Sequence, residues 1–285
     1  MERVARGSLV FHRYPSVPAA VHAIDEQDVY VALDLTSTRP TLYVASAAGA
    51  SVARVLERIS TVDPTVRVVD THPLGTADPN GLETFYLMLA TTIVGFTTVF
   101  QVRANAGGLP LRQWTVFVVA LGVGASLAFT LVEGPLLHRL DLPVPESWGI
   151  LALQLVAVAS FASLMAVLIG PWAILPTWLF FVVLGNSSSG GAVAPPLLPP
   201  PFAFVSQWLP SGATVTALRE AVYFPTYQHA HPIVVLASWV TALFAVMAQQ
   251  GVGVGHGVDE QAAGAGADQA ALLGLVPQPV RGLGG

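Results

Sequence analysis

The chain contains a stretch from Ser147 to Leu218 that has no Asp, Glu, Lys, Arg or His. Soluble domains carry charged side chains on their turns and surfaces, so such a stretch does not suit a soluble core. Further uncharged apolar runs cover residues 84–102, 114–132 and 232–248. Each run approaches the ~20 residues that a helix needs to cross a bilayer core. The sequence therefore predicts an α-helical multi-pass membrane protein.

The long uncharged stretch divides into two further spans. Gly170-Pro171 separates a span near residues 148–169 from a shorter one near 172–184, which Pro176 is expected to kink. We therefore expect about five transmembrane helices within a membrane domain over residues 84–250.

Composition supports this prediction and excludes several classes of protein. Only 10% of the 285 residues are charged, against about 25% in a typical soluble domain. The net charge is -5 and no basic patch exists, which argues against nucleic-acid binding. The chain has no cysteine, so disulfides and thiolate metal sites are excluded. All twelve basic residues are arginine. Because a P-loop needs a lysine, the chain cannot itself be a P-loop ATPase.

Residues 1–83 predict a small α/β domain. Short apolar stretches at Leu9–Phe11, Val29–Leu35, Thr41–Ala45 and Val66–Val69 are typical of strands. Residues 18–27 and 50–59 place apolar side chains at helical spacing. About eighty residues barely support a core, so we expect the domain to be incomplete at its N-terminus.

The loops predict an orientation. Residues 103–112 contain two arginines and no acid, which indicates a cytoplasmic loop. Residues 1–83, 133–147 and 185–231 then lie outside the cell membrane, and residues 251–285 form a disordered cytoplasmic tail. Residues 1–30 contain no signal peptide. Either the first span exports the N-terminal domain, or an upstream helix is missing, and we favour the second.

The outer loop over residues 185–231 is the most distinctive segment. It is polar and Gly-rich, then Pro-rich, then apolar, and it suits either a re-entrant outer gate or an ordinary connector. The candidate gate residues are Gly185, Asn186, Ser187, Ser188, Gly190, Gly191, Pro195, Pro196, Trp208 and Pro210. Residues 211–224 predict an amphipathic helix with Arg219 and Glu220 at the lipid headgroups. Glu133, at the end of the second span, is a further candidate charge at the membrane edge.

No pattern indicates an enzyme, a cofactor site or a metal site. His229 and His231 could bind a metal only with ligands that the nearby sequence does not supply. The three serines at 187–189 lie outside any Gly-x-Ser-x-Gly motif, so nucleophilic catalysis is not predicted.

The order of these parts resembles a known family. The phrases are Gly-Asn-Ser-Ser-Ser-Gly-Gly-Ala-Val-Ala-Pro-Pro from Gly185, Trp-Leu-Pro-Ser-Gly-Ala from Trp208, Ala-Leu-Arg-Glu-Ala-Val-Tyr-Phe from Ala217 and Asp-Val-Tyr-Val-Ala-Leu from Asp28. Together they are similar to the YhgE/Pip group of actinobacterial membrane proteins, related to permease subunits of type-2 ABC exporters. The resemblance implies six spans in the complete fold, the first preceding the outer domain, and a generic role in export or the envelope.

Two functions remain open. The first is an exporter-like permease that needs a separate ATPase subunit or forms a homo-oligomer, with its coupling segment in residues 103–113. The second is a receptor or scaffold that serves envelope assembly, secretion or phage adsorption. The substrate is not predicted.

Overall fold

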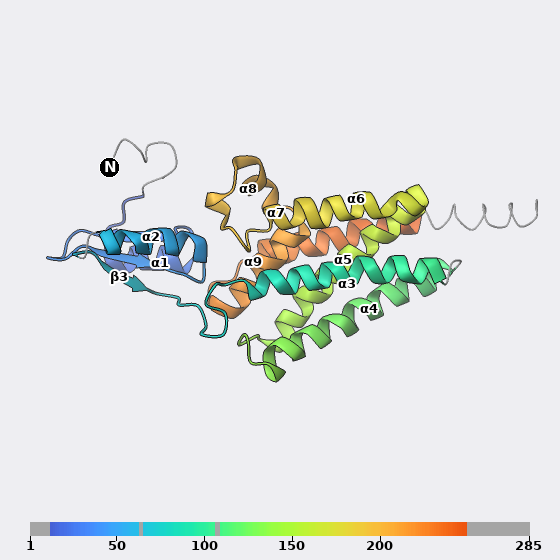
Figure 1. Cartoon of the computed structure of the whole chain (residues 1–285), viewed down its shortest axis with the longest axis horizontal. Coiled ribbons are helices and arrows are strands. Elements are labelled where there is room, and N and C mark those ends of the chain that lie inside the picture. Colours follow the sequence, from blue (N-terminus) through green and yellow to red (C-terminus); the bar gives the residue numbers. More distant parts are fainter. Residues whose placement is uncertain (1–11, 63–64, 106–108, 250–285) are drawn as a thin grey trace, which may run out of the picture.

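The computed structural model describes residues 12–62, 65–105 and 109–249. A small α/β domain stands at one end of an elongated bundle of helices (Figure 1). The predominantly helical fold and the small sheet that the sequence predicts are confirmed. The strand predicted at Leu9–Phe11 and the tail predicted to be disordered lie outside the described residues.

The α/β domain contains α1 (Val17–Asp25), β1 (Val31–Asp34), β2 (Thr41–Val44), α2 (Ala50–Val62) and β3 (Arg67–Asp70). The hydroxyl oxygen of Ser16 accepts a hydrogen bond from the Ala19 N–H and caps α1. The sheet order is β1-β2-β3, with β1 and β2 antiparallel and β2 and β3 parallel. Parallel neighbours need a crossover, and α2 supplies it.

Four helical segments of the described residues are long and apolar enough to cross a membrane. The first is α3 (Glu83–Asn105). The second, Leu111–Leu136, joins α4 (Leu111–Leu131) to the π-helical turn η1 (Val132–Leu136). The third is Val144–Ser188 and the fourth is Ala230–Gln249.

The third segment, 45 residues long, folds back on itself. It begins with α5 (Val144–Ile169) and turns at Gly170, which has a φ of +58°. The rings of Phe161 and Phe180 then stack with their centroids 4.9 Å apart. A straight helix would separate these residues by about 28 Å. The segment is therefore a helical hairpin, and its shape agrees with the division predicted at Gly170-Pro171.

The second arm of this hairpin is irregular. It passes through η2 (Gly170–Ala173), α6 (Ile174–Trp178), the π-helical η3 (Leu179–Gly185) and α7 (Asn186–Ser188). Pro176 lies in α6, just before the wide turns of η3. A proline removes a backbone donor, which accounts for irregular helix near this residue.

The bundle is built around α5, which packs against α3, α4 and α9 (Pro210–Tyr223). Buried side chains of α5 include Leu151, Leu155 and Ala159, each 0% exposed. Large apolar side chains also cover the outside of the bundle, among them Val116 and Leu168. This distribution is the one expected of helices surrounded by hydrocarbon.

The connections gather at two ends of the bundle. The α/β domain, residues 133–147 and residues 189–231 lie at one end. The end of α3, the start of α4, the turn at Gly170 and the end of the helix Ala230–Gln249 lie at the other (Figure 1). The orientation predicted from the basic loop at residues 103–112 requires residues 1–83, 133–147 and 185–231 to lie on one side, and the described parts of these segments do share one end. Which end faces the cytoplasm stays a prediction.

Candidate functional site

The candidate site is centred on α9, which comes between the hairpin Val144–Ser188 and the last helix Ala230–Gln249 in the sequence. It follows η4 (Pro195–Leu197) and α8 (Pro200–Ser206). The prediction that this helix is amphipathic is wrong, and the level of its two charges relative to the lipid headgroups stays a prediction. Eleven of its fourteen residues are buried. Small side chains such as Ala213, Ala217 and Ala221 let α9 pack closely against its neighbours on several sides, so little of its surface is left to face outward.

Both charges of α9 are buried and have partners. Arg219 is 8% exposed and donates from its guanidinium to the carbonyl of Gly190 at 2.9 Å. Glu220 is 4% exposed and accepts a hydrogen bond from the His229 backbone N–H at 2.9 Å. The other Glu220 oxygen lies 3.0 Å from the His229 ring Nδ1. Buried charges are costly unless paired, so these contacts fix the position of both residues.

The segment from Gly190 to Ala194, called the Gly-rich turn below, is packed tightly against the bundle. Gly190 has a φ of +73°, a backbone conformation that favours glycine. A Cβ on Gly191 would lie 2.7 Å from the Cβ of Phe85, at the start of α3. The two glycines therefore allow the turn to approach both α9 and α3.

The predicted gate residues before this turn continue a helix, although they were expected to begin a polar loop. Gly185 ends η3, and a Cβ there would lie 2.6 Å from the hydroxyl of Ser211 on α9. Asn186, Ser187 and Ser188 form α7, which directly continues η3, and the Ser188 hydroxyl donates to the Leu184 carbonyl.

The remaining gate residues connect the turn to α9. Pro195 and Pro196 lie in η4, and Pro210 begins α9, a position where the missing N–H costs nothing. The Trp208 carbonyl accepts a hydrogen bond from the Trp239 indole on the last helix at 2.9 Å. The indole of Trp208 is 52% exposed.

Glu133 does not join the charges of α9. It lies in η1, and the charges that act on it are those of Glu83 and Arg139. Arg139 itself pairs with Glu83 at 3.0 Å.

The bundle also contains a buried polar cluster that the sequence did not reveal. The Gln154 side chain, 0% exposed, donates from its amide to the Thr92 hydroxyl at 3.1 Å. Its oxygen accepts from the Thr214 hydroxyl at 3.0 Å. Thus one amide links α3, α5 and α9. A lone glutamine in a long apolar helix is the signal that could have found this cluster, because hydrocarbon cannot satisfy an amide.

The segment after α9 completes the core of the α/β domain. Phe224 is 1% exposed and packs with Ile24, Ala45 and Ala48. The His72 ring stacks on Phe224 with a centroid distance of 4.5 Å.

Two tyrosines in the same region have shifted pKa values. Burial raises the pKa of Tyr223 to about 12, and the carboxylate of Asp78 adds to the shift. Burial also raises the pKa of Tyr30, against the opposing effect of the Arg219 charge. Both phenols therefore ionise less readily than an ordinary tyrosine.

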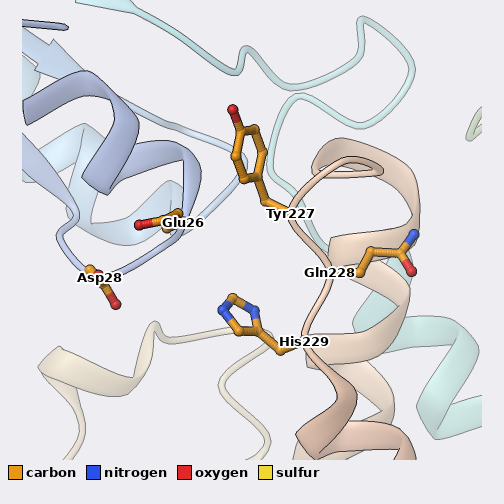
Figure 2. Close-up of a pocket in the computed structure, with 5 residues that line it drawn as sticks. All are labelled: Glu26, Asp28, Tyr227, Gln228 and His229. Atoms are coloured by element: carbon orange, nitrogen blue, oxygen red, sulfur yellow. The ribbon is translucent and has the colours of Figure 1, made fainter. Parts of the chain in front are cut away.

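A cavity of about 220 Å³ lies between the α/β domain and the segment after α9. Figure 2 shows Glu26 and Asp28 on one side and Tyr227, Gln228 and His229 on the other. His231 packs instead against Trp208, so the two histidines do not act together. In the described part of the chain, no group of three His, Cys, Asp or Glu side chains could hold a metal ion.

Comparison of the chain with protein-family models, curated proteins and solved structures gave no match.

Proposed function

We propose that the chain is an integral membrane permease of the type-2 ABC exporter kind. It would move a substrate out of the cell, or support envelope export, together with a separate ATPase or partner. One observation carries this proposal: α9 is buried at one end of a bundle of crossing-length helices and connects it to both the Gly-rich turn and the α/β domain. A gate at one mouth of a permease needs such a segment. The resemblance to the YhgE/Pip group supports the same function.

In this proposal the bundle crosses the cell membrane five times, because the third apolar segment is a hairpin. The α/β domain and residues 185–231 face outward, and the connection between α3 and α4 faces the cytoplasm. The chain has no cysteine, so single cysteines can be labelled with an impermeant thiol reagent. Ser37→Cys and Ala192→Cys, both at exposed positions, should label in intact cells, and Arg112→Cys should not. Labelling of Arg112→Cys in intact cells would contradict the proposed orientation and indicate the opposite one.

The ATPase must be another chain, because this one has no lysine for a P-loop. The α3–α4 connection is the expected contact. Beside it, the guanidinium carbon of Arg103 at the end of α3 lies 5.6 Å from the centroid of the Trp114 ring in α4. Purification of the full chain from its native membrane should recover a P-loop ATPase. Arg112→Glu should reduce that recovery, and Arg39→Glu, an exposed arginine of the α/β domain, should not. Absence of any ATPase, or equal recovery with both variants, would contradict the permease proposal.

The alternative is a receptor or scaffold that does not transport. One observation favours it: the cavity lined by Glu26 and His229 borders the α/β domain, and a second cavity of about 290 Å³ is lined by residues of that domain, among them Ser46, Arg54 and Asp70. The same purification separates the two functions, because a scaffold should recover an envelope protein in place of an ATPase.

A further inference from the structure

The Gly-rich turn contacts the α/β domain as well as α9. The backbone N–H of Ala194 donates to the hydroxyl oxygen of Ser51 on α2 at 3.0 Å. A Cβ on Gly49 would lie 3.0 Å from the Cβ of Ala194, and Ala194 is only 3% exposed. Two segments 143 residues apart in sequence therefore touch with no space between them.

The other side of the turn is held by the bundle. Arg219 binds the carbonyl of Gly190, and Gly191 lies against Phe85 of α3. Within five residues, the turn thus contacts α2 of the α/β domain, α3 and α9. If α9 moved relative to the α/β domain, either the hydrogen bond between Arg219 and Gly190 or the one between Ala194 and Ser51 would have to break.

The α/β domain holds this segment at a second point. Phe224, directly after α9, lies in the core of the α/β domain. The segment from Gly190 to Phe224 is therefore attached to that domain near both of its ends, through Ala194 and through Phe224. Movement of α9 relative to the α/β domain requires one attachment to open.

We propose that the α/β domain is a latch that holds the outer gate through the contact of Ser51 and Gly49 with Ala194. While the domain is docked, the Gly-rich turn and α9 keep the arrangement seen here. A ligand or partner that displaces the domain would release them. The role of this segment as a gate rests on the proposed function, whereas its attachment to the α/β domain does not.

The first test measures amide hydrogen exchange of the full chain in lipid nanodiscs. Ser51→Ala removes the acceptor of the Ala194 N–H, and residues 189–198 should then exchange about five-fold faster, as expected for loss of one hydrogen bond. Ser37→Ala, which removes an exposed hydroxyl bonded within the same domain, should leave the turn unchanged. Equal exchange in Ser51→Ala and the unmodified chain would overturn the latch.

The second test closes the latch covalently. The chain has no cysteine. A Cβ on Gly49 would lie 3.0 Å from the Cβ of Ala194, whereas disulfides need about 3.5–4.5 Å, so a small shift of the turn would let the pair Gly49→Cys and Ala194→Cys form a disulfide. Mild oxidation should link it, and residues 189–198 should then exchange more slowly than after reduction. The pair Gly75→Cys and Ala194→Cys is the control, because Gly75 has no atom within 4 Å of its Cβ position. Failure of the first pair to link, or equal linking of both pairs, would overturn the contact.

These measurements need neither a substrate nor an ATPase. A latch that behaves as expected in a chain that recovers no ATPase would leave the latch standing and refute the permease. Recovery of the ATPase together with unchanged hydrogen exchange in Ser51→Ala would support the permease and refute the latch.

Discussion

The α/β domain and the helical bundle differ in how each completes its core. The bundle fills its interior with its own helices, and α5 supplies many of the buried residues. The α/β domain has a three-stranded sheet, and its core includes Phe224 from the segment that follows α9. A domain of this size has little apolar area to bury by itself. The comparison shows that the domain depends on the bundle for its core as well as for its anchorage.

The two regions also differ in their polar contacts. The bundle buries an amide between two hydroxyls at Gln154, where no water competes. The α/β domain uses contacts closer to its surface, such as the Ser46 hydroxyl that donates to the Asp70 carboxylate. Substitutions in the α/β domain should therefore affect its docking, and substitutions in the bundle should affect the stability of the helices.

The largest effect is expected for Phe224→Ala. Removal of a fully buried aromatic side chain typically costs about 3–5 kcal/mol. The α/β domain should lose its docking and become sensitive to protease, with the helices still protected. Limited proteolysis in detergent, read by the fragments released, measures this. Phe204→Ala is the matched control, because Phe204 is 64% exposed. Unchanged proteolysis of Phe224→Ala would show that the α/β domain completes its core alone.

A smaller effect is expected for Gly191→Trp, which tests whether the turn between the two regions is rigid. The Cβ at this position meets Phe85, and overpacking of this kind costs about 1–3 kcal/mol. We expect lower abundance in the membrane and a lower melting temperature. Ala192→Trp, at the exposed neighbouring position, should be tolerated. If both variants are equally abundant, the turn is looser than its packing indicates.

Gln154→Leu tests the buried polar contacts of the bundle. Hydrogen bonds between membrane helices contribute roughly 0.6 kcal/mol each, so loss of both should cost about 1 kcal/mol. The two threonine hydroxyls can bond to their own helices, which limits the loss. Thermal unfolding in detergent measures the change, with Gln101→Leu at an exposed site of α3 as control. A loss several times larger would mean that this amide determines how α9 packs.

The last effect is absent at neutral pH and concerns alkaline pH at the junction of the two regions. Burial raises the pKa of Tyr223 from 10.0 to about 12. Because the folded state favours the neutral phenol, its contribution to stability is complete below pH 10 and declines as the pH rises toward 12. Unfolding measured from pH 9 to 12 should show a shallower decline in Tyr223→Phe than in the unmodified chain. Tyr86→Phe, at an exposed position, should leave the slope unchanged.

The sequence alone determined the parts of the molecule whose signals are local. An uncharged apolar run shows a crossing-length helix by composition and length, and the break at Gly170-Pro171 is visible as a pair of residues. Alternating apolar residues likewise placed β1, β2 and β3. These features depend on neighbours along the chain and need no partner.

The tertiary structure alone decided what the candidate site contacts. The sequence predicts that Arg219 and Glu220 lie on one face of an amphipathic helix, yet their partners at Gly190 and His229, which lie outside that helix, allow their burial. The contact of Ala194 with Ser51 and the insertion of Phe224 into the α/β core join residues far apart in sequence. Burial and pairing of this kind depend on which surfaces meet, and no local pattern of residues records that.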